Sequence, residues 1–470
     1  MHIVLVSIIL FIIITLTTPP CNLAASYLLP NVSPKMEKPE FWIKKIKIPS
    51  RLLLTPEEIQ GINETSLKNQ DLYLWSVKDL KEEWTREEIL SFLREDREGF
   101  GRIDEGRYDK YGNSLKESFW IELQKNLNEE SLKEKNQLLF GLIVKRTDIR
   151  FFPTHEIIIG SPTNSEFDQI QHSTVPPGSL IGVYHFSKDN LWAYVQTKFV
   201  RGWVWAKDLA IAKEKMEAVG YDEVTIRLVI TGDFINVYYD LSHQQIAFTV
   251  QMGTSFPIIA LPEQTKEMKN DYIIKIPFRE IDGELTFREG YIPIGKDVIS
   301  GFLSYTQENL ARQAFKMLHQ PYGWGEMFGA RDCSRFIMDL FSTSGILMPR
   351  NSKFQARMGI NLGQTASMTS KEKEKILDQA MPFATLLRLP GHIMLYLGKD
   401  HGRYYAIHNI WGIQKTGELG PVLEKIGRVV VSDLSLGSSG PNGSLLDRIT
   451  DIRFIGPKPA TAKEFPVMPQ

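Results

Sequence analysis

The chain has 470 residues, too many for one hydrophobic core, and at about 150 residues per domain it predicts three or four domains. The charges of its 55 basic and 56 acidic residues nearly cancel, so no broad attraction to nucleic acid or to an anionic membrane surface is expected. With 43% hydrophobic and 24% charged residues, the composition is that of an ordinary folded protein.

The first 25 residues predict a secretory signal peptide. Residues 3–16 form an apolar run broken only by Ser7 and Thr15, which is too short for a membrane span, and small residues follow up to Ala25. No Lys or Arg precedes the run, so an uncleaved N-terminal anchor is the alternative. We expect an exported protein of the periplasm or cell envelope, with no membrane span in the mature chain.

The two cysteines are Cys21 and Cys333. Cleavage after Ala25 would leave Cys333 as a single thiol in an exported chain, where no intramolecular disulfide can form. A lone cysteine on an apolar helix is often an inert buried residue, but this setting favours a nucleophile. Lipid attachment at Cys21 is an alternative to signal peptide cleavage, although Pro19 and Pro20 stand where such sites have small flexible residues.

Residues 26–140 predict an N-terminal helical domain. Three capping boxes mark helix starts, at Thr55 to Glu58, Thr85 to Glu88 and Ser114 to Glu117. The charged, glycine-containing stretch 94–111 predicts an irregular loop. The apolar residues are few and scattered, so this segment is expected to pack against the rest of the chain.

Residues 141–215 and 216–300 predict two small antiparallel barrels. In the first, short runs of β-branched and aromatic residues begin at Gly141, Leu180, Trp192 and Gly202, separated by turn signals. The end of the second resembles the end of the first, since Gly-Trp-Val-Trp-Ala-Lys-Asp-Leu from Gly202 parallels Gly-Tyr-Ile-Pro-Ile-Gly-Lys-Asp-Val from Gly290. This repeat suggests two related barrels, and coincidence over eight residues is the alternative.

The last domain, residues 301–470, opens with a helical pattern over 309–318 and then carries Cys333 where a loop becomes a helix. A helix N-terminus is expected to lower the pKa of this thiol and to supply N–H donors for an oxyanion. Two strands, 392–398 and 404–409, predict a hairpin that places His392 beside His408.

A thiol, an imidazole and a third polar group form the general plan of cysteine nucleophilic catalysis. The hypothesis is that Cys333 is the nucleophile, His392 the general base and then acid, and His408 the orienting group. A metal site from His392, His401 and His408 lacks a matching carboxylate arrangement, so no metal or other cofactor is expected. The remaining histidines are expected to be surface or packing residues: His155, His172, His185, His243, His319 and His401.

Four elements in this order resemble the NlpC/P60 family of papain-like cell-wall peptidases: Pro-Tyr-Gly-Trp-Gly at 321–325, Asp-Cys-Ser at 332–334, Gly-His-Ile-Met-Leu-Tyr-Leu-Gly at 391–398 and Ala-Ile-His at 406–408. The architecture is similar to one branch of that family, in which a helical domain and two bacterial SH3-type barrels precede the peptidase domain. The resemblance implies a multidomain α+β fold with an N-terminal helical segment, two SH3-like β-barrels and a C-terminal papain-like domain.

The resemblance also implies an endopeptidase that cuts peptidoglycan stem peptides or muropeptides between γ-D-glutamate and a diamino acid. By this resemblance Cys333, His392 and His408 match the catalytic residues, and Tyr322 matches a tyrosine near the oxyanion. Asp332 and Ser334 match the pair that recognises the free amine of an N-terminal L-alanine. Asp332 could equally be a plain helix N-cap.

Trp324 is a candidate for a pocket wall, and Tyr194 for an aromatic with which the first barrel narrows the cleft. The chain departs from the family pattern at Arg335, where glycine is usual, and at residues 384–389, where Gly-Asp-Leu usually begins the strand region. Two other functions remain open: an amidase or acyltransferase that uses the same triad, and a non-catalytic cell-wall binding protein.

Overall fold

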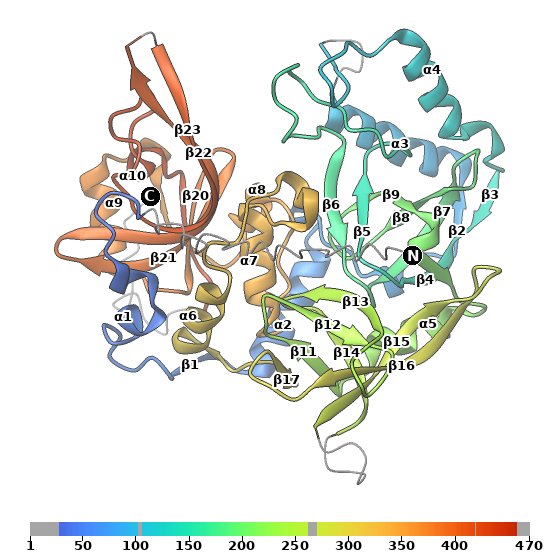
Figure 1. Cartoon of the computed structure of the whole chain (residues 1–470), viewed down its shortest axis with the longest axis horizontal. Coiled ribbons are helices and arrows are strands. Elements are labelled where there is room, and N and C mark those ends of the chain that lie inside the picture. Colours follow the sequence, from blue (N-terminus) through green and yellow to red (C-terminus); the bar gives the residue numbers. More distant parts are fainter. Residues whose placement is uncertain (1–27, 102–105, 262–269, 419, 458–470) are drawn as a thin grey trace, which may run out of the picture.

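The computed structural model describes residues 28–101, 106–261, 270–418 and 420–457. The predicted signal peptide and Cys21 lie outside the described residues. Three antiparallel sheets surround one central helix, α7 (Cys333–Ser342), with the C-terminal sheet on one side and the two other sheets on the opposite side (Figure 1).

Two of the three predicted capping boxes are confirmed. Thr55 caps α2 (Pro56–Lys68) and Thr85 caps α3 (Arg86–Phe100), and each Oγ accepts a backbone N–H at 3.3 Å while a glutamate returns the bond. The third is wrong, because Ser114 pairs with Tyr108 as an isolated bridge and α4 (Glu117–Asn126) begins after Lys116. The predicted loop 94–111 is also partly wrong, since α3 continues to Phe100.

The N-terminal segment packs against the rest of the molecule, as expected, but in two separate places. Trp42, in α1 (Pro39–Ile43), packs on Tyr405 with ring centroids 5.3 Å apart, and β1 (Leu52–Leu54) pairs with β18 (Tyr305–Thr306) of the C-terminal domain. Ile89 of α3, by contrast, belongs to the apolar cluster of the seven-stranded sheet formed by residues 139–211. The buried side chains of 26–140 are therefore shared among the apolar clusters of the other domains, and the predicted helical domain is divided between them.

The first large sheet has seven strands, which confirms the predicted strands beginning near 141, 180, 192 and 202. Its strands are β4 (Leu139–Ile143), β5 (Thr147–Arg150), β6 (Gln171–Val175), β7 (Leu180–Phe186), β8 (Trp192–Gln196), β9 (Arg201–Trp205) and β10 (Leu209–Ile211). The order across the sheet is β10-β4-β7-β8-β9-β5-β6.

The second large sheet follows α5 (Lys215–Glu223) and also has seven strands: β11 (Arg227–Ile230), β12 (Phe234–Tyr238), β13 (Ile246–Gln251), β14 (Ser255–Ala260), β15 (Asp271–Arg279), β16 (Leu285–Pro293) and β17 (Val298–Ser300). Its order, read from β17, is β17-β11-β14-β15-β16-β12-β13. Strand for strand this is the order of the first sheet, so the two units share one topology. We propose that they are related domains over 141–215 and 216–300, and that 301–470 is a third.

The C-terminal domain contains α6 (Gln307–Lys316), η6 (Trp324–Gly329), α7, α8 (Ser352–Gln355), α9 (Ser370–Leu377) and α10 (Leu445–Arg448). Its six-stranded sheet has the order β19-β24-β20-β21-β22-β23. These strands are β19 (Ile360–Gln364), β24 (Asp451–Phe454), β20 (Thr385–Leu389), β21 (His392–Asp400), β22 (Arg403–Gly417) and β23 (Gly420–Asp433). The predicted hairpin of residues 392–398 and 404–409 is confirmed as β21 and β22.

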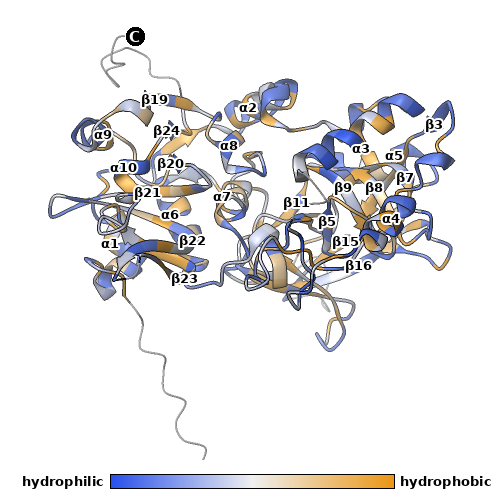
Figure 2. Cartoon of the chain, turned by 90° about the horizontal axis from the view of Figure 1, so that it is seen from above, coloured by the Kyte–Doolittle hydropathy of each residue, from blue (hydrophilic) through white to orange (hydrophobic). Residues whose placement is uncertain are grey.

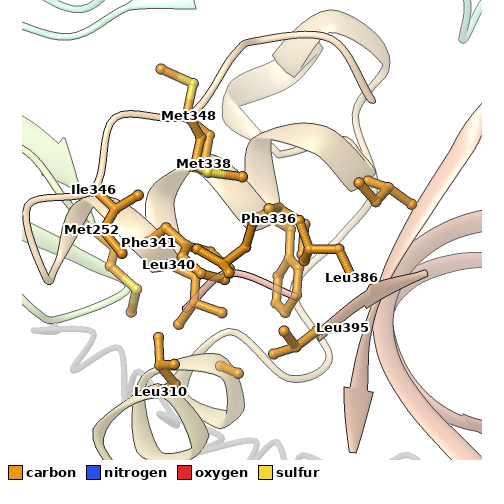
Figure 3. Packing of buried hydrophobic residues seen from close by; sticks show 14 of the residues in the cluster. Met252, Leu310, Phe336, Met338, Leu340, Phe341, Ile346, Met348, Leu386 and Leu395 are labelled. Carbon is orange, nitrogen blue, oxygen red and sulfur yellow. The ribbon is translucent and has the colours of Figure 1, made fainter. Parts of the chain in front are cut away.

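Helix α7 holds the sheets together. Its buried side chains Phe336, Leu340 and Phe341 meet Leu386 and Leu395 of the C-terminal sheet in one apolar cluster, which also includes Met252 from the turn after β13 (Figure 3). Large apolar side chains packed on all sides fix the position of the helix, and with it Cys333.

In the view from above, the hydrophilic residues gather on outer helices such as α9 and α3 (Figure 2). Among the described ranges, none of the helices has the length and hydropathy needed to cross a bilayer.

Candidate active site

Cys333 is the first residue of α7, where the loop after η6 becomes helical. Its N-cap is Asp332, whose Oδ1 accepts the backbone N–H of Arg335 at 2.8 Å. This confirms the predicted loop-to-helix position and the N-cap role of Asp332. The thiol therefore lies at the helix end where backbone N–H groups lack intrahelical partners, and such groups are the donors that an oxyanion requires.

The C-terminal sheet brings the two predicted histidines together. His392 begins β21, His408 lies in the adjacent antiparallel strand β22, and His392 Nε2 is 2.7 Å from His408 Nδ1. His408 Nε2 is in turn 2.8 Å from the Oγ of Ser432 on β23. Since Nε2 of His392 is occupied by His408, Nδ1 is the nitrogen that remains for a thiol.

Helix α7 packs directly on β21 and β22, the two strands that carry these histidines. The backbone N–H of Ile393, the residue after His392, donates toward the Cys333 sulfur. The predicted triad residues are thus gathered at one end of the helix.

The thiol is neutral in the substrate-free cleft. Burial raises the pKa of Cys333 to about 12 and the Asp332 carboxylate adds to this, although the Ile393 N–H and Arg350 act in the opposite direction. The Ser334 N–H in the first turn of α7 does lower this pKa, as predicted, but burial outweighs it and the net pKa lies above the ordinary value. The reason is that a dry environment destabilises a thiolate more than the helix N–H groups stabilise it.

The imidazoles are neutral as well. Burial lowers the pKa of His392 to about 3, with Arg448 acting in the same direction and Asp332 against it. Burial and the neighbouring His392 hold the pKa of His408 well below its ordinary value. Neutral His392 is in the form that can accept a proton.

A pocket of about 750 Å³ opens over Cys333. One wall comes from the first sheet and its loops, and it consists of Phe151, Asn164, Phe167, Gln169, Gln171 and His172. The opposite wall and floor come from the C-terminal domain, and they include Tyr322, Trp324, Asp332, Ser334, Arg350, Lys353, Arg388 and Trp411. The site is therefore built between two domains, which is a common place for a ligand pocket.

Tyr322 and Trp324 both line this pocket, as predicted. Burial, reinforced by Cys333 and Asp332, raises the pKa of Tyr322 far above its ordinary value, so its hydroxyl keeps its proton and can donate. Trp324 is 40% exposed and packs on Phe167, which lies in the loop between β5 and β6, with ring centroids 5.3 Å apart. Phe167 also packs on Trp411 at 5.1 Å, so three aromatic rings form a continuous wall.

The structure places Tyr194 away from the pocket. This side chain is fully buried in the first sheet, where its hydroxyl donates to Asp96 and lies 3.0 Å from Arg201 Nε. The expectation that Tyr194 narrows the cleft is therefore not met, because its ring lies with Trp192 in the apolar cluster that the first sheet shares with α3 and α4. Phe151, Phe167 and His172 are the aromatic residues of the first sheet and its loops that line the pocket.

Asp332 and Ser334 line the pocket but are already engaged. Arg350 donates to Asp332 Oδ2 at 2.7 Å and to Oδ1 at 3.1 Å, and its Nη1 also reaches Ser334 Oγ at 2.8 Å. Ser334 Oγ lies 3.0 Å from Asp332 Oδ1 as well. The two residues thus form one rigid unit with Arg350 beside the thiol.

Behind α7 lies a buried ion cluster centred on Glu326, a residue of η6 with no exposed side-chain surface. Glu326 accepts from Ser173 at 2.7 Å and from Thr174 at 2.6 Å, both on β6 of the first sheet. Arg335 lies 3.3 Å from the same carboxylate and 2.6 Å from Asp339. The departure from the usual glycine at Arg335 therefore supplies a cation that ties the first sheet to α7.

Sequence reasoning missed Arg350, Glu326 and Phe167. Arg350 and Glu326 carry charge within otherwise apolar or glycine-rich stretches, which is a weak signal, and Phe167 lies in a loop without any pattern. His172 was expected to be a packing residue, and it does stack on Phe151 at 4.6 Å, yet it also lines the pocket.

A helix that begins at a cysteine and packs on an antiparallel sheet carrying two histidines is the arrangement of papain-like cysteine hydrolases. Comparison with known protein families narrows this class. Residues 319–409 match the NlpC/P60 family and residues 160–205 match the SH3 domain of the SH3b1 type. The chain thus carries an NlpC/P60 cysteine peptidase domain, of a family of cell-wall hydrolases, together with an SH3 domain.

Among solved structures, an NlpC/P60 endopeptidase from Photobacterium damselae subsp. piscicida has a TM-score of 0.70 at 20% identity, covering 89% of this chain and 97% of that one. An NlpC/P60 family protein from Bacillus cereus ATCC 10987 has a TM-score of 0.43 at 15% identity, covering 61% of this chain and 83% of that one. No curated protein matches the chain. The first likeness supports the same fold along nearly the whole length of both chains.

Proposed function

We propose that the protein is a cysteine endopeptidase that hydrolyses the bond between γ-D-glutamate and a diamino acid in peptidoglycan stem peptides. The observation that carries the proposal is the position of Cys333, at a helix N-terminus and beside the hydrogen-bonded pair His392 and His408, in a pocket between two domains. The NlpC/P60 domain supports the choice of a cell-wall substrate.

In the proposed reaction His392 Nδ1 takes the proton of the Cys333 thiol as the sulfur attacks the γ-carbonyl carbon of D-glutamate. The carbonyl π electrons move to oxygen, which accepts hydrogen bonds from backbone N–H groups of α7 and from Tyr322. The C–N bond then breaks, the leaving amine takes the proton from His392, and a thioester remains. Water, deprotonated by His392, hydrolyses the thioester and restores the thiol.

The charges in the pocket support a substrate rich in carboxylates. Arg350, Lys353 and Arg388 line it, against the single carboxylate of Asp332 among the described lining residues. A γ-linked D-glutamate keeps its α-carboxylate free, and that group would be attracted to these cations. An uncharged peptide would gain nothing from them.

We also propose a preference for a free N-terminal L-alanine, with Asp332 as the partner of its ammonium. Asp332 already pairs with Arg350, so the ammonium would share a carboxylate with one guanidinium rather than meet an unpaired charge. The preference is accordingly expected to be moderate, about tenfold in kcat/KM over an N-acetylated peptide.

The test is mass spectrometry of products from L-Ala-γ-D-Glu-diaminopimelate, with and without N-acetylation. Release of the dipeptide L-Ala-γ-D-Glu is expected, and Cys333→Ala should abolish it. The matched control is Cys333→Ser, which keeps the size of the residue but has a much weaker nucleophile. Undiminished turnover by Cys333→Ala would exclude covalent catalysis by this residue, and transfer of the acyl group to an added amine instead of water would indicate an acyltransferase.

The location that we propose is the periplasm or cell envelope, where peptidoglycan lies. The NlpC/P60 domain and the SH3 domain of residues 160–205 support this location, because cell-wall hydrolase families are typically extracellular or associated with the envelope.

A further inference from the structure

The row of hydrogen-bonded side chains that begins at His392 continues beyond His408. His408 is fully buried, and its second ring nitrogen, Nε2, lies 2.8 Å from Ser432 Oγ, which is also fully buried. His408 pairs with Val430 across β22 and β23, so Ser432, two residues further along, projects from the same face of the sheet. The result is an unbroken row of Ser432, His408 and His392 beside α7.

Only one arrangement of protons along this row is compatible with catalysis. If His408 carries its proton on Nδ1, it donates to His392 Nε2, and neutral His392 then holds its own proton on Nδ1, facing the thiol. In this form the Nδ1 of His392 carries a proton and has no free lone pair to accept the proton of the thiol. If His408 carries its proton on Nε2, its Nδ1 accepts from His392, and Nδ1 of His392 is free.

The protonated state imposes the same requirement. Once His392 holds both ring protons, its Nε2–H needs an acceptor, and His408 Nδ1 is the atom 2.7 Å away. His408 must then be protonated on Nε2, inside the protein, where an unpaired N–H is costly. The atom within hydrogen-bond distance of that N–H is Ser432 Oγ.

We propose that Ser432 is a positioning residue of the active site, which accepts the Nε2–H of His408 and thereby holds His392 in the tautomer that can deprotonate Cys333. The proposal rests on the proposed function for its catalytic meaning, but the proton arrangement itself is a property of the folded protein. It extends the three-residue set by a hydroxyl from a third strand, β23.

The charged groups around the row do not replace this hydroxyl. Arg448 and Asp332 act on His392 from α10 and from the cap of α7, with opposite effects on its pKa, and His392 is the titratable group that acts on His408. The choice between the two tautomers of His408 therefore rests on hydrogen bonding at Nε2.

The first experiment compares Ser432→Ala with Ser432→Thr in the full chain, using the γ-glutamyl tripeptide. Ser432→Ala should lower kcat/KM by about tenfold to a hundredfold, since a buried N–H is left without an acceptor, whereas Ser432→Thr should retain most of the activity. Thr385→Val is the matched control, because Thr385 is a fully buried residue of the same sheet whose hydroxyl has no hydrogen-bond partner among the described residues. Equal activity of Ser432→Ala and Thr385→Val would overturn the proposal.

The second experiment does not depend on the substrate. Alkylation of Cys333 by iodoacetamide should be slower in Ser432→Ala than in wild type at pH 7, and the difference should shrink toward pH 10 as solvent hydroxide replaces imidazole as the base. A purely structural effect would lower the rate by the same factor at every pH, and that result would contradict the proposal.

The third experiment reads the tautomer directly. With ring-¹⁵N histidine, and His408→Gln to assign the signals, His408 of the wild type should be protonated on Nε2 and lose that pattern in Ser432→Ala. A wild-type His408 protonated on Nδ1 would refute the proposal. If the wild type fails to cut the tripeptide, the proposed function falls, while the alkylation and ¹⁵N results still decide the role of Ser432.

Discussion

Two polar networks meet α7, and they differ in charge. On the side of the C-terminal sheet, His392, His408 and Ser432 form a row of neutral groups. On the side of the two barrel sheets, Glu326, Arg335 and Asp339 form a cluster of full charges in which every side chain is buried.

The difference has a physical consequence. Neutral imidazoles keep a nitrogen lone pair that can accept a proton, which a general base requires. For Glu326, burial opposes ionisation, but Arg335, Arg350 and Arg146 overcome it and hold the pKa of the carboxyl well below its usual range. One network is suited to moving a proton, and the other to keeping the domains in place as long as Glu326 is ionised.

The largest effect is expected from removing the base. His392→Ala should lower kcat/KM by about a thousandfold, since general acid–base catalysis contributes about 10²–10⁴-fold, with little change in the midpoint of thermal unfolding. Steady-state kinetics on the tripeptide, with calorimetry of the same samples, measures both. A loss below tenfold would mean that another group is the base.

Glu326→Gln should act in the opposite way, on stability more than on chemistry. It leaves buried guanidinium groups without their carboxylate and should lower the free energy of unfolding by about 3–5 kcal/mol at pH 7, as measured by urea denaturation.

The pH dependence of this loss checks its cause. Because the pKa of Glu326 is lowered in the folded state, its stabilisation is present above the unfolded value of about 4.3 and is lost as pH falls toward the folded value. The difference between wild type and Glu326→Gln should therefore be constant from pH 6 to 9 and shrink in acid. A difference that vanished near pH 7 would contradict this assignment.

The rate at which Cys333 is alkylated should show how much its reactivity depends on the neutral row of His392, His408 and Ser432. In His392→Ala only the thiolate reacts, and with the pKa of Cys333 raised to about 12 the rate of alkylation should rise about tenfold per pH unit between 7 and 10. Wild type should react faster at pH 7 and converge with the variant at high pH. Saturation of the wild-type rate near pH 7 would instead indicate a preformed thiolate.

The smallest effect is expected from an exposed ion pair across the cleft. Lys425 lies 2.5 Å from Glu166, but the two side chains are 53% and 43% exposed. Lys425→Ala should change the free energy of unfolding by no more than about 1 kcal/mol, in contrast to Glu326→Gln. Thermal unfolding of the two variants side by side tests whether burial, rather than charge alone, separates them.

The predictability of the site differs between its parts. The hairpin that pairs His392 with His408 follows from alternation and a turn signal, both local properties. The pairing of β21 with β22 confirms this hairpin. The capping box at Ser114 is wrong because a bridge to Tyr108 takes its place, and Tyr194 lies in the core because its ring packs in the apolar cluster shared with α3 and α4. Local pattern is reliable where the competing interactions are also local.

By itself the sequence determined the order of the domains, the helix that begins at Cys333 and the two histidines on neighbouring strands, because periodicity, caps and turns act over a few residues. Only the tertiary structure decided that burial raises the thiol's pKa, that Arg350 holds Asp332, and that Ser432 reaches His408. These features depend on solvent exclusion and on contacts between residues far apart in the chain, and no spacing along the sequence encodes them.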